Sequence, residues 1–440
     1  MIKSISKNFI IIIAISLFFG KCIQVPKQFE GLTPGIWRGI FILKDQRQPI
    51  VTKGKNKIVT LDVTTDKQYF TSPFNFTISR NESKELIMTV TNAEEKIVFS
   101  PIQYGRDRKT GEDTFYVELN PYDAVLKGIY DENQMKGNFI VRDKPNYYIP
   151  FEAKFGQNFR FEKIPKKANI DLTGTWQVTF GKNTTDEFNA IGEFQQTNNH
   201  LKGTFRTETG DFRYLEGLVE ENKVKLSCFD GAHVFLYDAF IQNDSLQGIF
   251  YSGTHYQVPF VGFRTDSPKL IHGDSLVKIL SNKPFIFSLE DTNGKMISNA
   301  DPEYANKLKL IQITGSWCPN CRDEGEFLNS YLKENPNSNI AIFSLAFERY
   351  PDRQKALERV KKYKQAMNTS YPMLYAGLSN RDSASLLIPQ IDGIRAYPTL
   401  LFLDKNNSIV KVHSGFDGPA TSKFAEFKNE FETTIKELNK

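Results

Sequence analysis

The chain has 440 residues, of which 40% are hydrophobic and 24% are charged, and its formal net charge is +5. This length is enough for two to four domains of about 100–200 residues each. The charge is spread along the chain without a basic cluster interleaved with aromatic residues, which argues against nucleic acid as a partner. Four cysteines are too few for a disulfide scaffold in a chain of this length.

Residues 1–22 are typical of an export signal. Lys3 and Lys7 precede a short apolar run, FIIIIAISLFF at 9–19, as in secretory signals. A membrane-spanning helix needs roughly 20 apolar residues, more than this run supplies. Cys22 follows the run and suggests lipid attachment, although Lys21 departs from the usual lipoprotein pattern; the alternative is an uncleaved anchor with an incidental cysteine. Both interpretations place the protein outside the cytoplasm, on the periplasmic side of a bacterial envelope.

Residues 31–264 have the pattern of antiparallel β structure. Aromatic and β-branched runs alternate with Gly, Asn and Asp at short intervals, as in a series of hairpins. One unit recurs, with a large apolar residue, a polar residue, glycine, any residue and an aromatic residue. Its copies are LKGIY (126–130), MKGNF (135–139), LKGTF (201–205) and LQGIF (246–250). This repetition predicts an antiparallel meander.

A longer repeat divides this region into two related β modules, which we predict at 30–166 and 168–265. GIWRGIF at 35–41 resembles GTWQVTF at 174–180, and YYIPF at 147–151 resembles YQVPF at 256–260. Closing a meander into a barrel removes its exposed edges, so we expect two lipocalin-like barrels. We expect Trp37 and Trp176 to be core residues rather than ligand contacts. Cys228, in an alternating strand pattern, is expected to be a buried residue rather than a reactive thiol.

After Pro268 the pattern changes to alternating strands and helices. This alternation predicts an α/β domain with a central mixed sheet at 280–440. The expected strands are 285–289, 308–314, 340–347, 399–403 and 409–413, and the expected helices are 318–334, 352–367 and 419–438.

Two of the four cysteines lie in GSWCPNC, at 315–321, between a predicted buried strand and a predicted helix. Cys318 is therefore expected at the helix N-terminus, where free N–H groups and the helix dipole stabilise an anion. Such a position lowers a thiol pKa from about 8.5 into a range of roughly 3.5–7.5. Cys318 would attack a disulfide, and Cys321 would resolve the mixed disulfide. Pro319 suits the first helical turn.

Two other interpretations of the cysteine pair are weaker. A structural zinc site needs two more ligands, and none of the five histidines has a ligand-like spacing. A purely structural disulfide at a helix start would be strained and therefore reducible. The chain also has no G-x-G-x-x-G strand–helix unit for a nucleotide, so we expect neither a metal nor a cofactor.

The order of motifs resembles that of thioredoxin-like disulfide reductases, in which a W-C-x-x-C motif is followed much later by a proline before a strand. It is most similar to the TlpA-like branch of exported, often lipid-anchored proteins. The similar segments are GSWCPNCRDE (315–324), LAFER (345–349), YPTLLFLDK (397–405) and HSGFDGPAT (413–421), within 280–440.

This resemblance implies roles for several further residues. Pro398 would be a cis proline facing the dithiol, and the backbone at Tyr397 would pair with an extended substrate. Glu324 lies three residues after Cys321 and would exchange a proton with it; the alternative is a solvated helix residue. Trp317 would shield the thiolate and shape the contact surface.

The sequence thus predicts an exported thiol–disulfide oxidoreductase that reduces protein disulfides and receives electrons from a membrane partner. Pro319-Asn320 departs from the Gly-Pro of general thioredoxins, so the motif alone leaves reductant and oxidant open; the resemblance favours a reductant. One alternative is a thioredoxin-fold peroxidase, although Thr314 lacks the proline of a P-x-x-x-T-x-x-C signature. The other is a binding protein whose β modules capture a ligand or partner.

Overall fold

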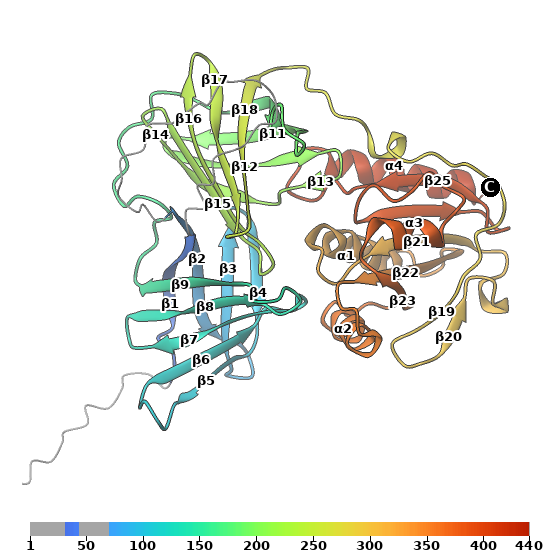
Figure 1. The fold of residues 1–440 in the computed structure, drawn as a ribbon, viewed down its shortest axis with the longest axis horizontal. Helices are drawn as coiled ribbons and strands as arrows, with labels where there is room; N and C mark the ends of the chain where they lie inside the picture. Colours follow the sequence, from blue (N-terminus) through green and yellow to red (C-terminus); the bar gives the residue numbers. More distant parts are fainter. Residues whose placement is uncertain (1–30, 44–69, 440) are drawn as a thin grey trace, which may run out of the picture.

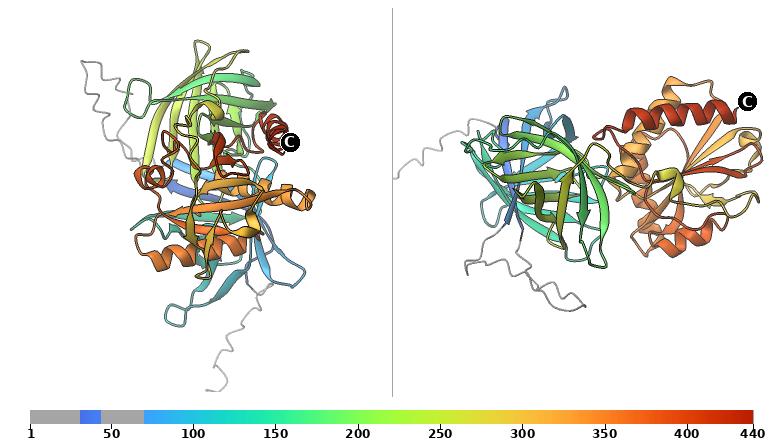
Figure 2. Two further views of the ribbon diagram at one scale, coloured as in Figure 1. Left: turned by 90° about the vertical axis from the view of Figure 1, so that its right-hand side faces the viewer. Right: turned by 90° about the horizontal axis from the view of Figure 1, so that it is seen from above.

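The computed structural model describes residues 31–43 and 70–439. The predicted export signal and Cys22 lie outside these residues. Two β sheets lie on one side of the molecule and an α/β domain lies on the other (Figures 1 and 2). Within the described ranges, no helix is long and apolar enough to cross a membrane.

The first sheet has nine antiparallel strands in the order β4-β3-β2-β1-β9-β8-β7-β6-β5. Its inner face is the first hydrophobic core, which includes Trp37, Phe41 and Phe139. Within the part of the chain that the structure describes, β4 and β5 remain the two edges, so the barrel expected here is nearly closed rather than closed. The strands are β1 (Gly35–Leu43), β2 (Phe70–Arg80), β3 (Leu86–Asn92), β4 (Glu95–Phe99), β5 (Ile102–Arg106), β6 (Asp113–Glu118), β7 (Ala124–Tyr130), β8 (Gln134–Val141) and β9 (Tyr148–Phe155).

The second sheet is a closed barrel, as expected. Its order is β11-β10-β18-β17-β16-β15-β14-β12-β13, and an additional β11–β12 pairing closes the ring. The strands are β10 (Gly174–Phe180), β11 (Phe188–Thr197), β12 (His200–Thr207), β13 (Gly210–Asp211), β14 (Leu215–Glu220), β15 (Lys223–Phe229), β16 (Val234–Gln242), β17 (Ser245–Ser252) and β18 (Tyr256–Arg264). Cys228 is fully buried in its core, which confirms the interpretation of that residue.

The two tryptophans of the long repeat have matching environments. Trp37 lies in β1 and Trp176 in β10, the first strand of each sheet, and each of these strands pairs with the last strand of its sheet. Each indole N–H donates to a backbone carbonyl four residues earlier, Trp37 to Thr33 at 2.9 Å and Trp176 to Leu172 at 3.0 Å. Both side chains are buried, which confirms that they are core residues.

The glycines of the short repeat mark places where neighbouring strands approach closely. Gly128 of β7 and Gly137 of β8 are directly opposite each other. A Cβ atom on Gly128 would lie 2.0 Å from the carbonyl oxygen of Lys136, and one on Gly137 would lie 2.1 Å from that of Lys127. Only glycine allows this approach. The glycine of the short repeat is therefore required where two strands lie close together.

One edge of the second barrel packs into the hydrophobic core of the first sheet. Phe229, Val234 and Tyr251 of the second sheet belong to the core cluster of the first. Polar contacts also cross the boundary: Ser72 donates to the carbonyl of Phe235 at 2.9 Å, and the Asn92 amide donates to that of Phe229 at 2.9 Å. The two β sheets therefore pack directly against each other.

The α/β domain is built on a five-stranded mixed sheet in the order β23-β22-β21-β24-β25. β21, β22 and β23 are parallel, and β24 is antiparallel to both of its neighbours. The strands are β21 (Leu308–Thr314), β22 (Ile340–Glu348), β23 (Met373–Leu378), β24 (Thr399–Leu403) and β25 (Ile409–Ser414). The helices are α1 (Pro319–Glu334), α2 (Arg353–Ala366), α3 (Arg381–Leu387) and α4 (Phe424–Leu438), and the small elements before the sheet are η1 (Gly273–Ser275), β19 (Ser288–Glu290), β20 (Met296–Ser298) and η2 (Pro302–Tyr304).

Most elements expected in this domain are present, with some differences. β20, β23 and α3 were not predicted, the strand expected at 285–289 covers Ser288–Glu290, and the last helix begins at Phe424 rather than at 419. The segment before α4 is a loop because its backbone donors face the second barrel: Gly418 N donates to Asp211 at 2.8 Å and Ser422 N donates to Glu193 at 2.8 Å. Tertiary contacts therefore replace the first helical turn expected there.

Candidate active site

Cys318 and Cys321 form a disulfide at the start of α1, with their Cα atoms 5.2 Å apart. Cys318 is the N-cap residue of the helix, and its sulfur accepts a hydrogen bond from the backbone N–H of Cys321 at 3.2 Å. Pro319 occupies the first turn. The strand–loop–helix context expected for this motif is confirmed, and the helix N-terminus is in place to stabilise a thiolate at Cys318.

The structure brings Pro398 to the dithiol from the neighbouring strand, because Thr399 of β24 is opposite Ile313 of β21. The Tyr397-Pro398 peptide is cis, as expected, and directly precedes β24. The sulfur of Cys318 lies 3.5 Å from the carbonyl oxygen of Tyr397. The two cysteines are nearly buried, with Cys318 only 4% exposed, so a reaction partner must approach through the space beside Cys318.

Trp317 forms a fixed wall beside Cys318. Its indole N–H donates to the carbonyl of Phe347 at 2.9 Å, and its ring meets that of Tyr397 edge to face with centroids 5.2 Å apart. The guanidinium of Arg349 lies over the tryptophan ring, 4.3 Å from its centre. Such contacts fix the ring in one orientation.

Glu324 lies on α1 behind the dithiol and is fully buried, so the alternative of a solvated helix residue is wrong. The amide of Gln312 in β21 donates to the Glu324 carboxyl at 2.9 Å and to the carbonyl of Cys321 at 3.2 Å. Burial raises the pKa of Glu324 to about 8, although the hydrogen bond from Gln312 lowers it. A carboxyl with such a pKa is suited to take up and return a proton near neutral pH.

A second buried carboxyl holds the loop before Cys318. Glu348, at the end of β22, accepts hydrogen bonds from the backbone N–H of Ser316 at 2.9 Å and from its hydroxyl at 2.7 Å. The hydroxyl also accepts a hydrogen bond from Arg359 at 3.2 Å. Burial raises the pKa of Glu348 to about 7, while the Ser316 donors and Arg359 oppose the change. Sequence reasoning included Glu348 in LAFER but assigned it no role.

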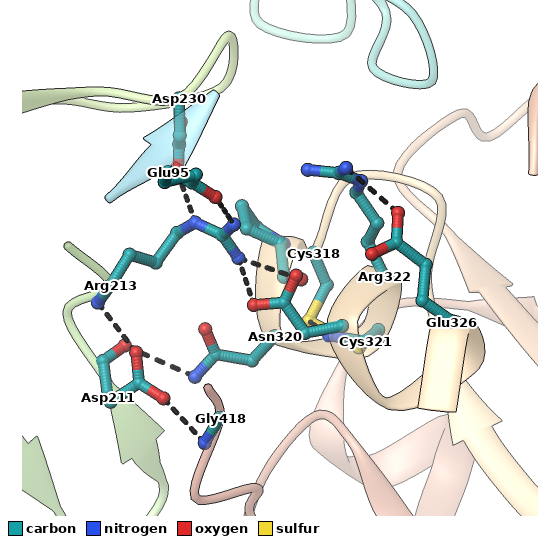
Figure 3. Close-up of polar contacts among 12 residues, drawn as sticks. Glu95, Asp211, Arg213, Asp230, Cys318, Asn320, Cys321, Arg322, Glu326 and Gly418 are labelled. Carbon is teal, nitrogen blue, oxygen red and sulfur yellow. Dashed lines mark hydrogen bonds and ion pairs between the residues drawn. A yellow bond between two sulfur atoms is a disulfide. The ribbon is translucent and has the colours of Figure 1, made fainter. Parts of the chain in front are cut away.

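Arg213, in the loop between β13 and β14, connects the dithiol helix to both β sheets (Figure 3). Its side chain is 3% exposed and pairs with Glu95 of β4 and Asp323 of α1. Its Nε atom also lies 3.5 Å from Asp230. A buried cation with this many acidic partners requires the three elements to keep their positions, since an unpaired buried charge is costly.

The dipeptide between the cysteines takes part in the same interface. The Asn320 amide donates to the backbone carbonyl of Asp211 at 3.2 Å, and the carbonyl of Pro319 accepts a hydrogen bond from Arg213 at 3.5 Å. Burial and the neighbouring Asp323 raise the pKa of Asp211 to about 7. Pro319 and Asn320 were expected only to influence the redox properties of the cysteine pair. In the structure they also contact the second barrel.

Sequence reasoning missed Arg213, Asp211 and Gln312. Gln312 gave a usable signal, because a glutamine within the apolar strand LKLIQIT (308–314) must find a buried partner. Arg213 and Asp211 gave none, because their partners are about a hundred residues away in the chain. Among the described residues, no group of three or more His, Cys, Asp or Glu side chains is placed to hold a metal ion.

No protein-family model matches the chain, and no curated protein matches it. Solved structures that resemble it are thiol–disulfide exchange proteins. One is a thiol:disulfide interchange protein of the thioredoxin family from Chlorobium tepidum, with 21% identity, covering 36% of this chain and 95% of that one at a TM-score of 0.28. Another is a thiol-disulfide oxidoreductase from Bacteroides fragilis, with 20% identity, 35% and 99% coverage and a TM-score of 0.25.

StoA from Bacillus subtilis is a third, with 19% identity, covering 34% of this chain and 99% of that one at a TM-score of 0.26. These likenesses cover about a third of the chain.

Proposed function

We propose that the chain is an exported thiol–disulfide oxidoreductase that reduces disulfides in proteins, of the TlpA-like type. The observation that supports this most directly is the disulfide between Cys318 and Cys321 at the N-terminus of α1, with the carbonyl of Tyr397 beside the outer sulfur. The division into β modules at 30–166 and 168–265 and a thioredoxin-like domain at 280–440 is part of the proposal. Lipid attachment at Cys22 would keep the protein at the membrane.

In the reduced protein, the Cys318 thiolate would attack one sulfur of a substrate disulfide, form a mixed disulfide and expel the other sulfur as a thiolate. Glu324 would then accept the proton of the Cys321 thiol. The resulting thiolate would attack the sulfur of Cys318, release the second substrate sulfur as a thiolate and leave the Cys318–Cys321 disulfide. Two electrons pass from the dithiol to the substrate, so a dithiol donor at the membrane must reduce the protein again.

Insulin reduction with single-cysteine variants tests this proposal. We expect Cys318→Ser to abolish reduction and to form no adduct, because the attacking thiolate is lost. Cys321→Ser should accumulate a mixed disulfide with insulin, because attack still occurs and resolution fails. The proposal is wrong if Cys318→Ser retains parental activity. Rapid consumption of hydrogen peroxide, without insulin reduction, would instead support the peroxidase alternative.

A further inference from the structure

A groove of about 380 Å³ separates the dithiol from the second barrel. Cys318, Trp317 and Tyr397 line it on the α/β side. The barrel side is formed by the start of β11, the end of β12, the loop carrying Arg213, and the start of β16. The space through which Cys318 can be reached is therefore shared by two domains.

The barrel presents one of its ends to this groove. The loops at 181–187, 208–214, 230–233 and 253–255 follow alternate strands of an antiparallel ring, so they lie at the same end of the barrel. The loop 208–214 reaches the dithiol helix, because Asp211 and Arg213 contact Asn320 and Asp323. β12 and β13 accordingly extend toward the α/β domain in Figure 1.

Aromatic rings lie on both walls of the groove, beside polar residues. Phe188, Phe212 and Phe235 stand at the rim of the barrel, with Phe212 and Phe235 centroids 5.6 Å apart. Trp317 and Tyr397 line the same groove from the other domain. An apolar side chain entering between these walls would be removed from water on both sides, which favours its binding.

Buried polar contacts join the two walls of the groove. Arg213 pairs with residues of β4 and α1, Asn320 donates to Asp211, and Gly418 N donates to the Asp211 carboxyl. These contacts join β4, the loop at 208–214, the start of α1 and the loop before α4. A preformed site of this kind spends little binding energy on ordering itself.

We propose that the second barrel supplies half of the substrate site. On the proposed function, the substrate is an extended peptide segment with an aromatic or large aliphatic side chain next to its disulfide-bonded cysteine. The segment lies along Tyr397, its cysteine sulfur meets Cys318, and its apolar side chain rests between Trp317 and Phe212. Cys318 attacks the disulfide of the segment, Cys321 then resolves the mixed disulfide, and two electrons pass from the dithiol to the segment.

Two synthetic peptides test this proposal. Each is an extended homodimer joined through one cysteine, and the pair differs only in Phe or Ser beside that cysteine. The reduced full chain should react with the Phe peptide at least about tenfold faster, the discrimination expected of an apolar subsite. Hydroxyethyl disulfide, which needs no subsite, reports the reactivity of Cys318 itself.

Equal rates with the two peptides would overturn the proposed substrate site but leave the proposed function standing. No reaction with any disulfide would contradict the proposed function.

Variants of the barrel locate the effect. Phe212→Ser should reduce the preference to about one, with each peptide rate divided by the rate of the same variant with hydroxyethyl disulfide, and Phe212→Leu should retain most of the preference. Thr209→Trp, at an exposed position in the groove, should slow both peptides without removing any packing, and Thr209→Ser is its control. Cys228 is fully buried in the barrel, so its resistance to a thiol reagent reports whether each variant is folded. If Phe212→Ser exposes Cys228, Thr209→Trp decides; unchanged peptide rates in Thr209→Trp would overturn the proposal.

Discussion

Arg213 of the second barrel and Asp323 of α1 form a buried ion pair directly beside the candidate dithiol (Figure 3). The same guanidinium pairs with Glu95 of the first sheet. The position of the helix that carries Cys318 therefore depends on residues from both β sheets. The surroundings of the dithiol are therefore set by contacts between domains as well as by the Cys-Pro-Asn-Cys motif.

Removing this cation should be costly. Arg213→Met leaves the Asp323, Glu95 and Asp230 carboxylates without their shared partner, and such a loss typically lowers the free energy of unfolding by about 3–5 kcal/mol. Asp323→Asn in the same chain should recover part of the loss, because one uncompensated charge is gone. Urea unfolding can be followed by the fluorescence of the tryptophans, of which there are three. Lys166→Met, in an exposed pair with Glu221, is the control and should cost less than about 1 kcal/mol. If both variants lose a similar free energy of unfolding, the buried ion pairs of Arg213 contribute no more than an exposed pair, and the prediction is wrong.

Glu324 should give the protein a characteristic pH dependence. Its carboxyl has an ordinary pKa of 4.5 when exposed and about 8 in the folded chain. Between these values the unfolded chain releases the proton and the folded chain retains it, so stability falls as pH rises from about 4.5 to about 8. Glu324→Gln does not titrate, so it should remove this part of the slope. Relative to the parent, the variant should gain about 1.4 kcal/mol of stability for each pH unit across this range. Urea unfolding of both proteins at pH 5 and pH 8 checks this.

The same variant should slow resolution of the mixed disulfide by about a hundredfold, because proton transfer by a positioned group contributes about 10²–10⁴. Stopped-flow measurement of the release of the second substrate thiol checks the rate. Glu326→Gln, on the exposed side of the same helix and paired with Arg322, should change neither rate nor slope. Equal effects of the two variants would remove Glu324 from the mechanism.

The glycine pair in the first sheet should be intolerant of substitution. Gly128→Ala would place a Cβ atom 2.0 Å from the carbonyl oxygen of Lys136, so the strands must separate, at a cost of about 1–3 kcal/mol. Gly105→Ala, in β5 of the same sheet, is the control because its nearest neighbour would lie 4.0 Å away. Thermal unfolding of both variants measures the difference. Equal thermal unfolding midpoints for the two variants would mean that the glycine of the short repeat is not required by close contact between strands.

Much of the fold was predictable because its signals are local. The strand at 308–314, the helix that follows Cys318 and the Pro398 turn are each encoded by adjacent residues, and all three are present. The repeat around Trp37 and Trp176 likewise predicted matching strands. The closed second barrel followed from the meander pattern, whereas the incomplete closure of the first depends on edge strands that no short motif specifies.

The surroundings of the dithiol were much less predictable. Arg213 looks like an ordinary charged loop residue, and only the folded chain shows that it is buried between Asp323 and Glu95. The loop before α4 was wrongly predicted as helix. Its backbone N–H groups donate to Asp211 and Glu193 of the second barrel, and the sequence gives no sign of these contacts between domains. Contacts of this range leave no periodicity in the sequence.

The reduction potential of the Cys318/Cys321 pair tests the central claim most directly. It can be measured by equilibrating the chain from residue 23 onward, carrying Cys228→Ser, with glutathione or dithiothreitol buffers, followed by thiol trapping. A reductase predicts a value near that of thioredoxin, about −270 mV. A value near −120 mV, as for a strong oxidant, would contradict the account and make the protein a disulfide donor.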